Sequence, residues 1–167
     1  GGTSIPGSTT VPAEDVIATD PDIVSHINGG TTAVSIIEAG KLIRNTSYAL
    51  EIVHCGNSKM IVEVMKIVKE IKAYPRIIIG NDAPSGTGVI PLGILRVINF
   101  LASLCDVKAE EAVAMATGNT ARLYKLNRGV MEVGKEADLV IMDAPMGRWA
   151  TMPSQPSKQA TFRELQE

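Results

Sequence analysis

The chain has 167 residues, and its 16 Lys and Arg against 18 Asp and Glu give a formal net charge of −2. This balance excludes a cationic surface that follows a phosphate backbone, and 4% aromatic residues are too few for base-stacking platforms, so we expect no nucleic-acid partner. Apolar residues make up 45% of the chain, as in a globular protein, yet no apolar run approaches the ~20 residues that span a bilayer, so we expect no membrane partner.

The first half of the chain alternates short apolar runs with longer amphipathic runs. After a short helix that opens at Pro12, we expect strands over 22–26, 48–53 and 76–80, followed by helices over 31–44, 60–71 and from Pro91 through Leu101. The strand starts are separated by 48 − 22 = 26 and 76 − 48 = 28 residues, which is the length of a βα unit. The pattern therefore predicts a parallel sheet, in one ordinary domain or in about two-thirds of a (β/α)8 barrel of ~250 residues.

The second half begins with two more helical segments. Asp106 is expected to cap a helix over 108–117, and residues 118–119 to separate it from a short helical turn that ends near Leu126. From Gly129 onward, two β segments joined by a turn are expected. The last residues are rich in Pro, Ser, Gln and Thr, which predicts a frayed or disordered tail.

The chain start and its cysteines bear on its origin. Gly1 and Gly2 stand where an initiator Met would be, so we expect a piece of a longer protein. Cys55 and Cys105 lack the spacing of metal or redox motifs. Buried, reduced thiols and a cytoplasmic protein are therefore expected.

Three titratable side chains follow the three predicted strands. His26, His54 and Asp82 are separated by 54 − 26 = 28 and 82 − 54 = 28 residues. Because the carboxyl ends of parallel strands meet at one rim, we expect these side chains on the same face. Neighbouring strands lie ~4.8 Å apart, so the backbones of His26 and Asp82 are expected roughly 10 Å apart. Two cations ~3.5 to 4 Å apart would fit between them, one on the imidazole and the other on the carboxylate.

Each residue also has a structural interpretation. A single histidine at a strand end is more often a hydrogen-bonded structural residue than a ligand, and for His54 we prefer that interpretation. Asp82, which follows Asn81, could equally cap a turn. The joint placement of His26 and Asp82 favours the functional interpretation over the structural one. Both side chains are costly to desolvate unless another group compensates their burial. Alternatively, the loop Ser85–Gly88 before a helix could hold a small anion, and the chain would then be a non-catalytic α/β binding module.

Three stretches resemble the metal-dependent amidohydrolase superfamily: Val24–Gly30, Gly80–Gly88 and Gly134–Ile141. Within it, the similarity is strongest to bacterial enzymes that open a cyclic amide, 6-oxo-tetrahydronicotinate, in nicotinate fermentation, with release of ammonia. The resemblance implies an α/β fold that is the C-terminal part of a TIM-type (β/α)8 barrel. Residues 1–127 would hold about strands six to eight, residues 128–147 a fragment of the small β-sandwich domain, and residues 148–167 the tail.

The resemblance also implies roles for individual residues. His26 would be the metal-binding histidine at the end of strand six. Asp82 would be the aspartate of strand eight, which binds a metal, accepts a proton from the attacking water and returns it to the departing nitrogen. Two divalent ions, zinc or iron, are the implied cofactors, a small cyclic amide the substrate, and a homo-oligomer the intact assembly. The implied substrate-binding residues are Thr3, Ser4, His54, Ser85, Gly86 and Thr87.

The superfamily takes further metal ligands from other strands. It uses a His-x-His pair of strand one, a carboxylate of strand four and a histidine of strand five, and none of these has a counterpart in this sequence. We therefore expect the isolated chain to bind zinc or iron weakly and to hydrolyse nothing.

Overall fold

A three-stranded parallel sheet forms the centre of the molecule. The computed structural model describes residues 11–29, 34–84 and 88–142. The strands β1 (Ile23–Val24), β2 (Ala49–Val53) and β3 (Ile77–Gly80) lie in that order, with Val24 opposite Leu50 and Glu51 opposite Ile78. Helices connect the strands, as parallel pairs require. The parallel sheet expected from the strand spacing is thus confirmed.

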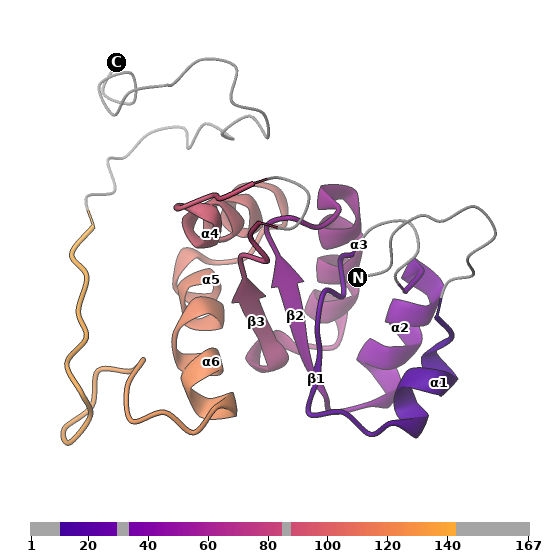
Figure 1. The fold of residues 1–167 in the computed structure, drawn as a ribbon, viewed down its shortest axis with the longest axis horizontal. Coiled ribbons are helices and arrows are strands. Elements are labelled where there is room, and N and C mark those ends of the chain that lie inside the picture. The colour runs from indigo at the N-terminus through magenta and orange to yellow at the C-terminus, as the bar shows by residue number, and fades with distance from the viewer. Residues whose placement is uncertain (1–10, 30–33, 85–87, 143–167) are drawn as a thin grey trace, which may run out of the picture.

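Helices flank the sheet. In Figure 1, α1, α2 and α3 lie beyond β1 and β2, whereas α4, α5 and α6 lie on the side of β3. None of the described helices is long and apolar enough to cross a membrane. The helices are α1 (Ala13–Ala18), α2 (Ile36–Asn45), α3 (Ser58–Glu70), α4 (Gly93–Leu104), α5 (Ala109–Ala116) and α6 (Gly118–Leu123), and a short 3-10 helix, η1 (Tyr74–Arg76), precedes β3.

The core fills the space between the sheet and these helices. In α3 the buried residues recur at helical spacing, so that one apolar stripe faces the sheet. In β3 three consecutive isoleucines are buried, because both faces of a parallel sheet are covered. The fully buried large side chains include Leu42, Ile43, Leu50, Ile52, Val64, Met65, Ile77, Leu101 and Met115.

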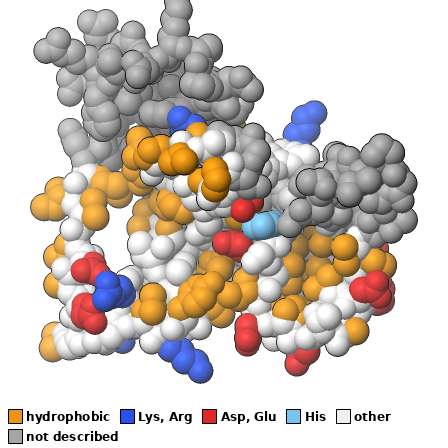
Figure 2. Space-filling view, in the orientation of Figure 1, with side chains coloured by type: hydrophobic (Ala, Val, Ile, Leu, Met, Phe, Trp, Pro, Cys, Tyr) orange, Lys and Arg blue, Asp and Glu red, His pale blue; other side chains and the backbone are white. Residues whose placement is uncertain are grey.

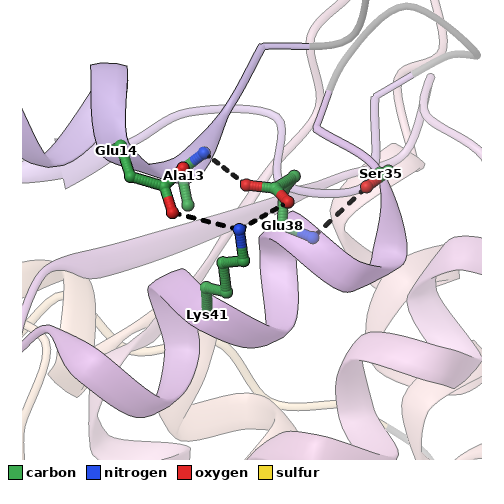
Figure 3. A network of polar contacts seen from close by, with 5 residues as sticks. All are labelled: Ala13, Glu14, Ser35, Glu38 and Lys41. Carbon is green, nitrogen blue, oxygen red and sulfur yellow. Dashed lines mark hydrogen bonds and ion pairs between the residues drawn. The ribbon is translucent and has the colours of Figure 1, made fainter.

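A polar network joins α1 to α2 just before and after β1 (Figure 3). The Glu38 carboxylate accepts a hydrogen bond from the backbone N–H of Ala13 at 2.6 Å. The Lys41 ammonium lies 3.0 Å from Glu14 and 2.9 Å from Glu38, and Ser35 caps α2 by accepting from the Glu38 N–H at 3.2 Å. The network therefore fixes the two helices that bracket the strand leading to His26.

Two details of the helical half differ from expectation. Asp106 does not cap α5, whose N-cap is Lys108, because Asp106 has a left-handed backbone with φ of 53° and pairs with Lys69 instead. Residues 118 and 119 do not separate two helices, because α6 begins at Gly118. The Asn119 amide donates to the carbonyl oxygens of Tyr74 (3.0 Å) and Ile77 (2.8 Å), which holds the first turn of α6 against β3.

Residues 128–142 form turns and extended chain, and the expected β segments are absent from this described stretch. Its apolar side chains are exposed, with Met131 at 85% and Ile141 at 98%. Figure 1 shows this segment running away from the sheet. A strand needs a partner for its backbone groups, and none lies beside it in the part of the chain that is described. The assignment of residues 128–147 to a β domain stays a prediction, and the tail 148–167 lies outside the described residues.

Candidate active site

His26 and Asp82 meet at the carboxyl end of the sheet. The Nε2 atom of His26 lies 3.4 Å from Oδ1 of Asp82, and about a quarter of each side chain is exposed (27% and 26%). On the face shown in Figure 2, a histidine side chain lies beside acidic side chains. The structure therefore places an imidazole and a carboxylate on one rim, as the strand spacing predicted.

Both residues lie beyond their strands and not within them. The strand expected over 22–26 ends at Val24, and His26 belongs to the turn over 25–28. His26 has a φ of 56° and Asp82 a φ of 55°, each two residues after a strand end. Non-glycine residues seldom adopt this left-handed conformation, and His and Asp are among those that tolerate it. Two residues with the same left-handed backbone thus bend the chain at the rim and bring the two side chains together.

Asn28 ties the turn of His26 to the end of β2. Its side chain is fully buried, its Oδ1 accepts from the Val53 N–H at 2.8 Å, and its Nδ2 donates to the Val53 carbonyl at 2.9 Å. Its backbone carbonyl accepts from Asn57 N–H at 2.6 Å. A Cβ at Gly56 would lie 2.2 Å from Asn28 Nδ2, so this close approach requires glycine. The sequence indicates a turn at Asn28, but not this bridge, because its partner Val53 lies 25 residues away.

His54 follows β2 directly, between the two other strands. Its N–H donates to the Gly80 carbonyl at 3.1 Å. Burial lowers the pKa of its imidazole, and the positive charge of Arg96 lowers that pKa further. Its Nδ1 is buried without a hydrogen-bond partner among the described residues. His54 thus lies close to the rim with an imidazole whose pKa is lowered, and its role as a substrate-binding residue stays a prediction.

Asn81 links the end of β3 to the start of α4. Its Nδ2 donates to the Ile90 carbonyl at 2.8 Å, and a Cβ at Gly93 would lie 2.1 Å from its Oδ1. This contact fixes the segment just before Asp82 against α4. The sequence does not indicate this contact, because Gly93 is twelve residues away and only the fold brings it to Asn81.

The structure does not describe all of the expected site residues. Thr3, Ser4, Ser85, Gly86 and Thr87 fall outside the described residues, as does most of the loop of the anion-binding alternative. No group of three or more His, Cys, Asp or Glu in the described ranges could hold a metal ion. A cavity of about 430 Å³ lies at the opposite end of the sheet, among residues that precede the strands, such as Asp22 and Arg76. We assign the chemistry to the rim, because the ligand-type side chains meet there.

The comparisons with known proteins decide the family. The family model described as "Amidohydrolase family" matches residues 8–167. This chain belongs to the amidohydrolase family. It is 57% identical over 147 residues to the enamidase of Eubacterium barkeri, across 88% of this chain and 38% of that protein. The crystal structure of enamidase, described as a new member of the amidohydrolase superfamily, matches with a TM-score of 0.82 and 57% identity, across 90% of this chain and 39% of that chain.

The amidohydrolase match confirms the resemblance seen in the three sequence stretches. The fold is that of the amidohydrolase superfamily, which is of the TIM-barrel type, and amidohydrolases are generally metal-dependent. The chain spans about two fifths of the length of the enamidase relatives that it matches. In TIM-barrel enzymes the active site lies at the carboxyl ends of the strands, which is where His26 and Asp82 meet.

Proposed function

We propose that this chain supplies one side of the metal centre of an enamidase-type amidohydrolase. Its substrate would be a small cyclic amide, such as 6-oxo-tetrahydronicotinate, opened with release of ammonia. Two observations support the proposal: 57% identity to enamidase and the pairing of His26 with Asp82 at the rim of the sheet. A cytoplasmic location and a homo-oligomeric state belong to the same proposal and rest on the similarity alone.

The distance between His26 Nε2 and Asp82 Oδ1 indicates how the two groups would share a metal ion. Two ligand atoms that each lie ~2.0 to 2.1 Å from one tetrahedral zinc ion are about 3.3 Å apart. A charge-assisted N–H···O hydrogen bond is shorter, at roughly 2.7 to 2.9 Å. His26 Nε2 and Asp82 Oδ1 are 3.4 Å apart, which matches two ligands of one ion. We therefore place both groups on the same cation, whereas the strand spacing had suggested one cation for each.

The donor set fits zinc or iron, because imidazole nitrogen and carboxylate oxygen suit both metals. When bound, such ions lower the pKa of a coordinated water and polarise the amide carbonyl. His26 would hold the shared ion through Nε2. Asp82 would bind through one oxygen and use the other to take the proton of the attacking water. The same carboxyl group then gives this proton to the ring nitrogen as the carbon–nitrogen bond breaks.

The remaining ligands must come from outside the described residues. The rim offers two ligands in the part of the chain that the structure describes, and a stable centre needs about four. The outer edges of β1 and β3 pair with no further strand among the described elements. Both facts support a partial barrel over residues 1–127, holding about strands six to eight. A β-sandwich fragment over 128–147 belongs to the same proposal and rests on the resemblance alone. The chain alone should then bind metal weakly and hydrolyse nothing.

A zinc titration followed by calorimetry tests this proposal. The wild-type chain should bind zinc with micromolar or weaker affinity, and His26→Gln and Asp82→Asn should each weaken binding at least ~10-fold, as loss of one of two ligands requires. Asp106→Asn is the matched control, because that carboxylate pairs with Lys69 at the surface, away from the rim. Unchanged zinc binding in His26→Gln, or nanomolar stoichiometric binding by the wild-type chain, would overturn the proposal.

A further inference from the structure

A cavity of about 430 Å³ lies at the amino ends of the strands, opposite the rim that carries His26 and Asp82. This is the lower end of the sheet in Figure 1. The cavity is lined mainly by the segments that enter the three strands and by α6, and all of these residues are described. Its size suits a small molecule. The metal centre proposed for the rim gives this cavity no role.

Carboxylates and guanidinium groups stand on different walls of the cavity. Asp20 and Asp22, which precede β1, form an acidic wall. Arg76, which directly precedes β3, and Arg122 of α6 form a basic wall. The strand β2 lies between β1 and β3, so the backbones of Asp22 and Arg76 are roughly 10 Å apart. The cavity therefore has opposite charges at its two ends.

Hydrogen bonds to neutral groups fix three of these side chains. The Tyr48 hydroxyl donates to Asp20 Oδ1 at 3.1 Å. Arg76 donates through both terminal nitrogens to carbonyl oxygens at the end of α2, and Arg122 donates to the Pro75 carbonyl. The hydroxyl and the carbonyls carry no net charge. These bonds therefore hold the walls in place and leave their charges without a counter-ion.

No residue of either wall has an ion-pair partner in the part of the chain that the structure describes. The two walls thus face the same cavity without neutralising each other. Burial also lowers the pKa of Arg76, because part of its guanidinium is removed from water. The cavity therefore favours a ligand with a negative charge at the basic wall and a positive charge at the acidic wall.

We propose that this cavity binds a small zwitterion, with its carboxylate on the basic wall and its ammonium on the acidic wall. A simple anion or cation would satisfy one wall and leave the other without a partner. The distance between the walls requires the two charges of the ligand to be several bonds apart. An α-amino acid reaches only one wall, because its ammonium and carboxylate share one carbon. The ligand class is therefore that of ω-amino acids, and this site is separate from the proposed metal centre.

NMR titration of the 15N-labelled, metal-free chain with 5-aminopentanoate tests the site. The side-chain amide of Asn119, which lines the cavity, should shift and saturate, whereas the ring signals of His26 at the opposite rim should not. Pentanoate, pentylammonium and glycine are titrated in parallel at constant ionic strength. Each lacks one charge or the separation between charges, so each should bind at least ~10-fold more weakly than 5-aminopentanoate.

Variants of each wall complete the test. Arg122 and Asp22 are both exposed, so Arg122→Gln and Asp22→Asn should keep the fold and each weaken binding of 5-aminopentanoate at least ~10-fold. Arg44→Gln and Glu63→Gln are the matched controls, because both residues form ion pairs outside the cavity lining, and binding should not change.

Three results would overturn the site. They are an Asn119 amide that 5-aminopentanoate leaves unmoved, binding of pentanoate or glycine as tight as that of 5-aminopentanoate, and unchanged binding in Asp22→Asn. Because these titrations contain no metal and report on the opposite end of the sheet, their outcome is independent of the zinc titration that tests the proposed function.

Discussion

His26 and Asp82 meet 3.4 Å apart although their strands, β1 and β3, are not paired with each other. The strand between them, β2, pairs with both. The two side chains come together because each residue lies two positions after its strand and has a left-handed backbone at the same rim. The geometry of the pair therefore depends on the contacts of two asparagines: Asn28 attaches the His26 turn to Val53 of β2, and Asn81 attaches the segment before Asp82 to Ile90, ahead of α4.

The Asn28 bridge should be needed for that geometry. Asn28→Ala removes both side-chain hydrogen bonds to Val53 and leaves buried backbone groups unpaired, so we expect a loss of about 1–3 kcal/mol in the free energy of unfolding. Urea denaturation measures this loss, and zinc binding should weaken as well. Asn127→Ala is the control, because Asn127 is exposed and donates only a long 3.4 Å hydrogen bond to Gly134. Equal stability of the two variants would contradict the role given to Asn28.

Gly56 should not tolerate a methyl group. Gly56→Ala places a Cβ 2.2 Å from Asn28 Nδ2 and 2.5 Å from its backbone oxygen, so the turn must move and the chain should lose stability. Gly40→Ala is the matched comparison, because its Cβ meets only the far ends of the Arg44 and Ile67 side chains. Inside a helix that change should be neutral or stabilise by up to about 1 kcal/mol. Thermal unfolding of both variants checks the contrast, and a Gly56→Ala chain as stable as wild type would refute it.

His54 should make the stability depend on pH. Burial lowers its pKa in the folded chain below the ordinary value of 6.5, so the unfolded chain binds the proton more readily. Stability should therefore fall as the pH drops below about 6.5, until the folded-state pKa is passed. Unfolding free energies between pH 7.5 and pH 5 measure this slope. His54→Gln should make the slope shallower, and an unchanged slope would show that His54 is not its source.

Cys105 should react slowly with thiol reagents. Burial raises the pKa of its thiol from 9.0 to about 11, which lowers the reactive thiolate fraction by about 100-fold near pH 8. In a Cys55→Ser chain, alkylation by iodoacetamide followed by mass spectrometry reports on Cys105 alone. The folded chain should react far more slowly than the chain in urea. Equal rates in the two states would argue against a buried thiol.

The sequence predicts the regular part of the fold and the common rim. Hydrophobic periodicity gives the strands and helices within a few residues, and the spacing of His26 and Asp82 gives their shared face. Non-local contacts decide the rest. The bridge from Asn28 to Val53 spans 25 residues, and Asp106 pairs with Lys69, which is 37 residues away, instead of capping a helix. The apolar run near Val140 resembles a strand but has no partner among the described residues.

The shared cation is tested most directly by anomalous diffraction from crystals of the chain soaked in zinc. We predict one anomalous peak about 2.1 Å from both His26 Nε2 and Asp82 Oδ1. Absence of density between these atoms, or two peaks that each contact only one of the pair, would contradict the metal centre proposed for this rim.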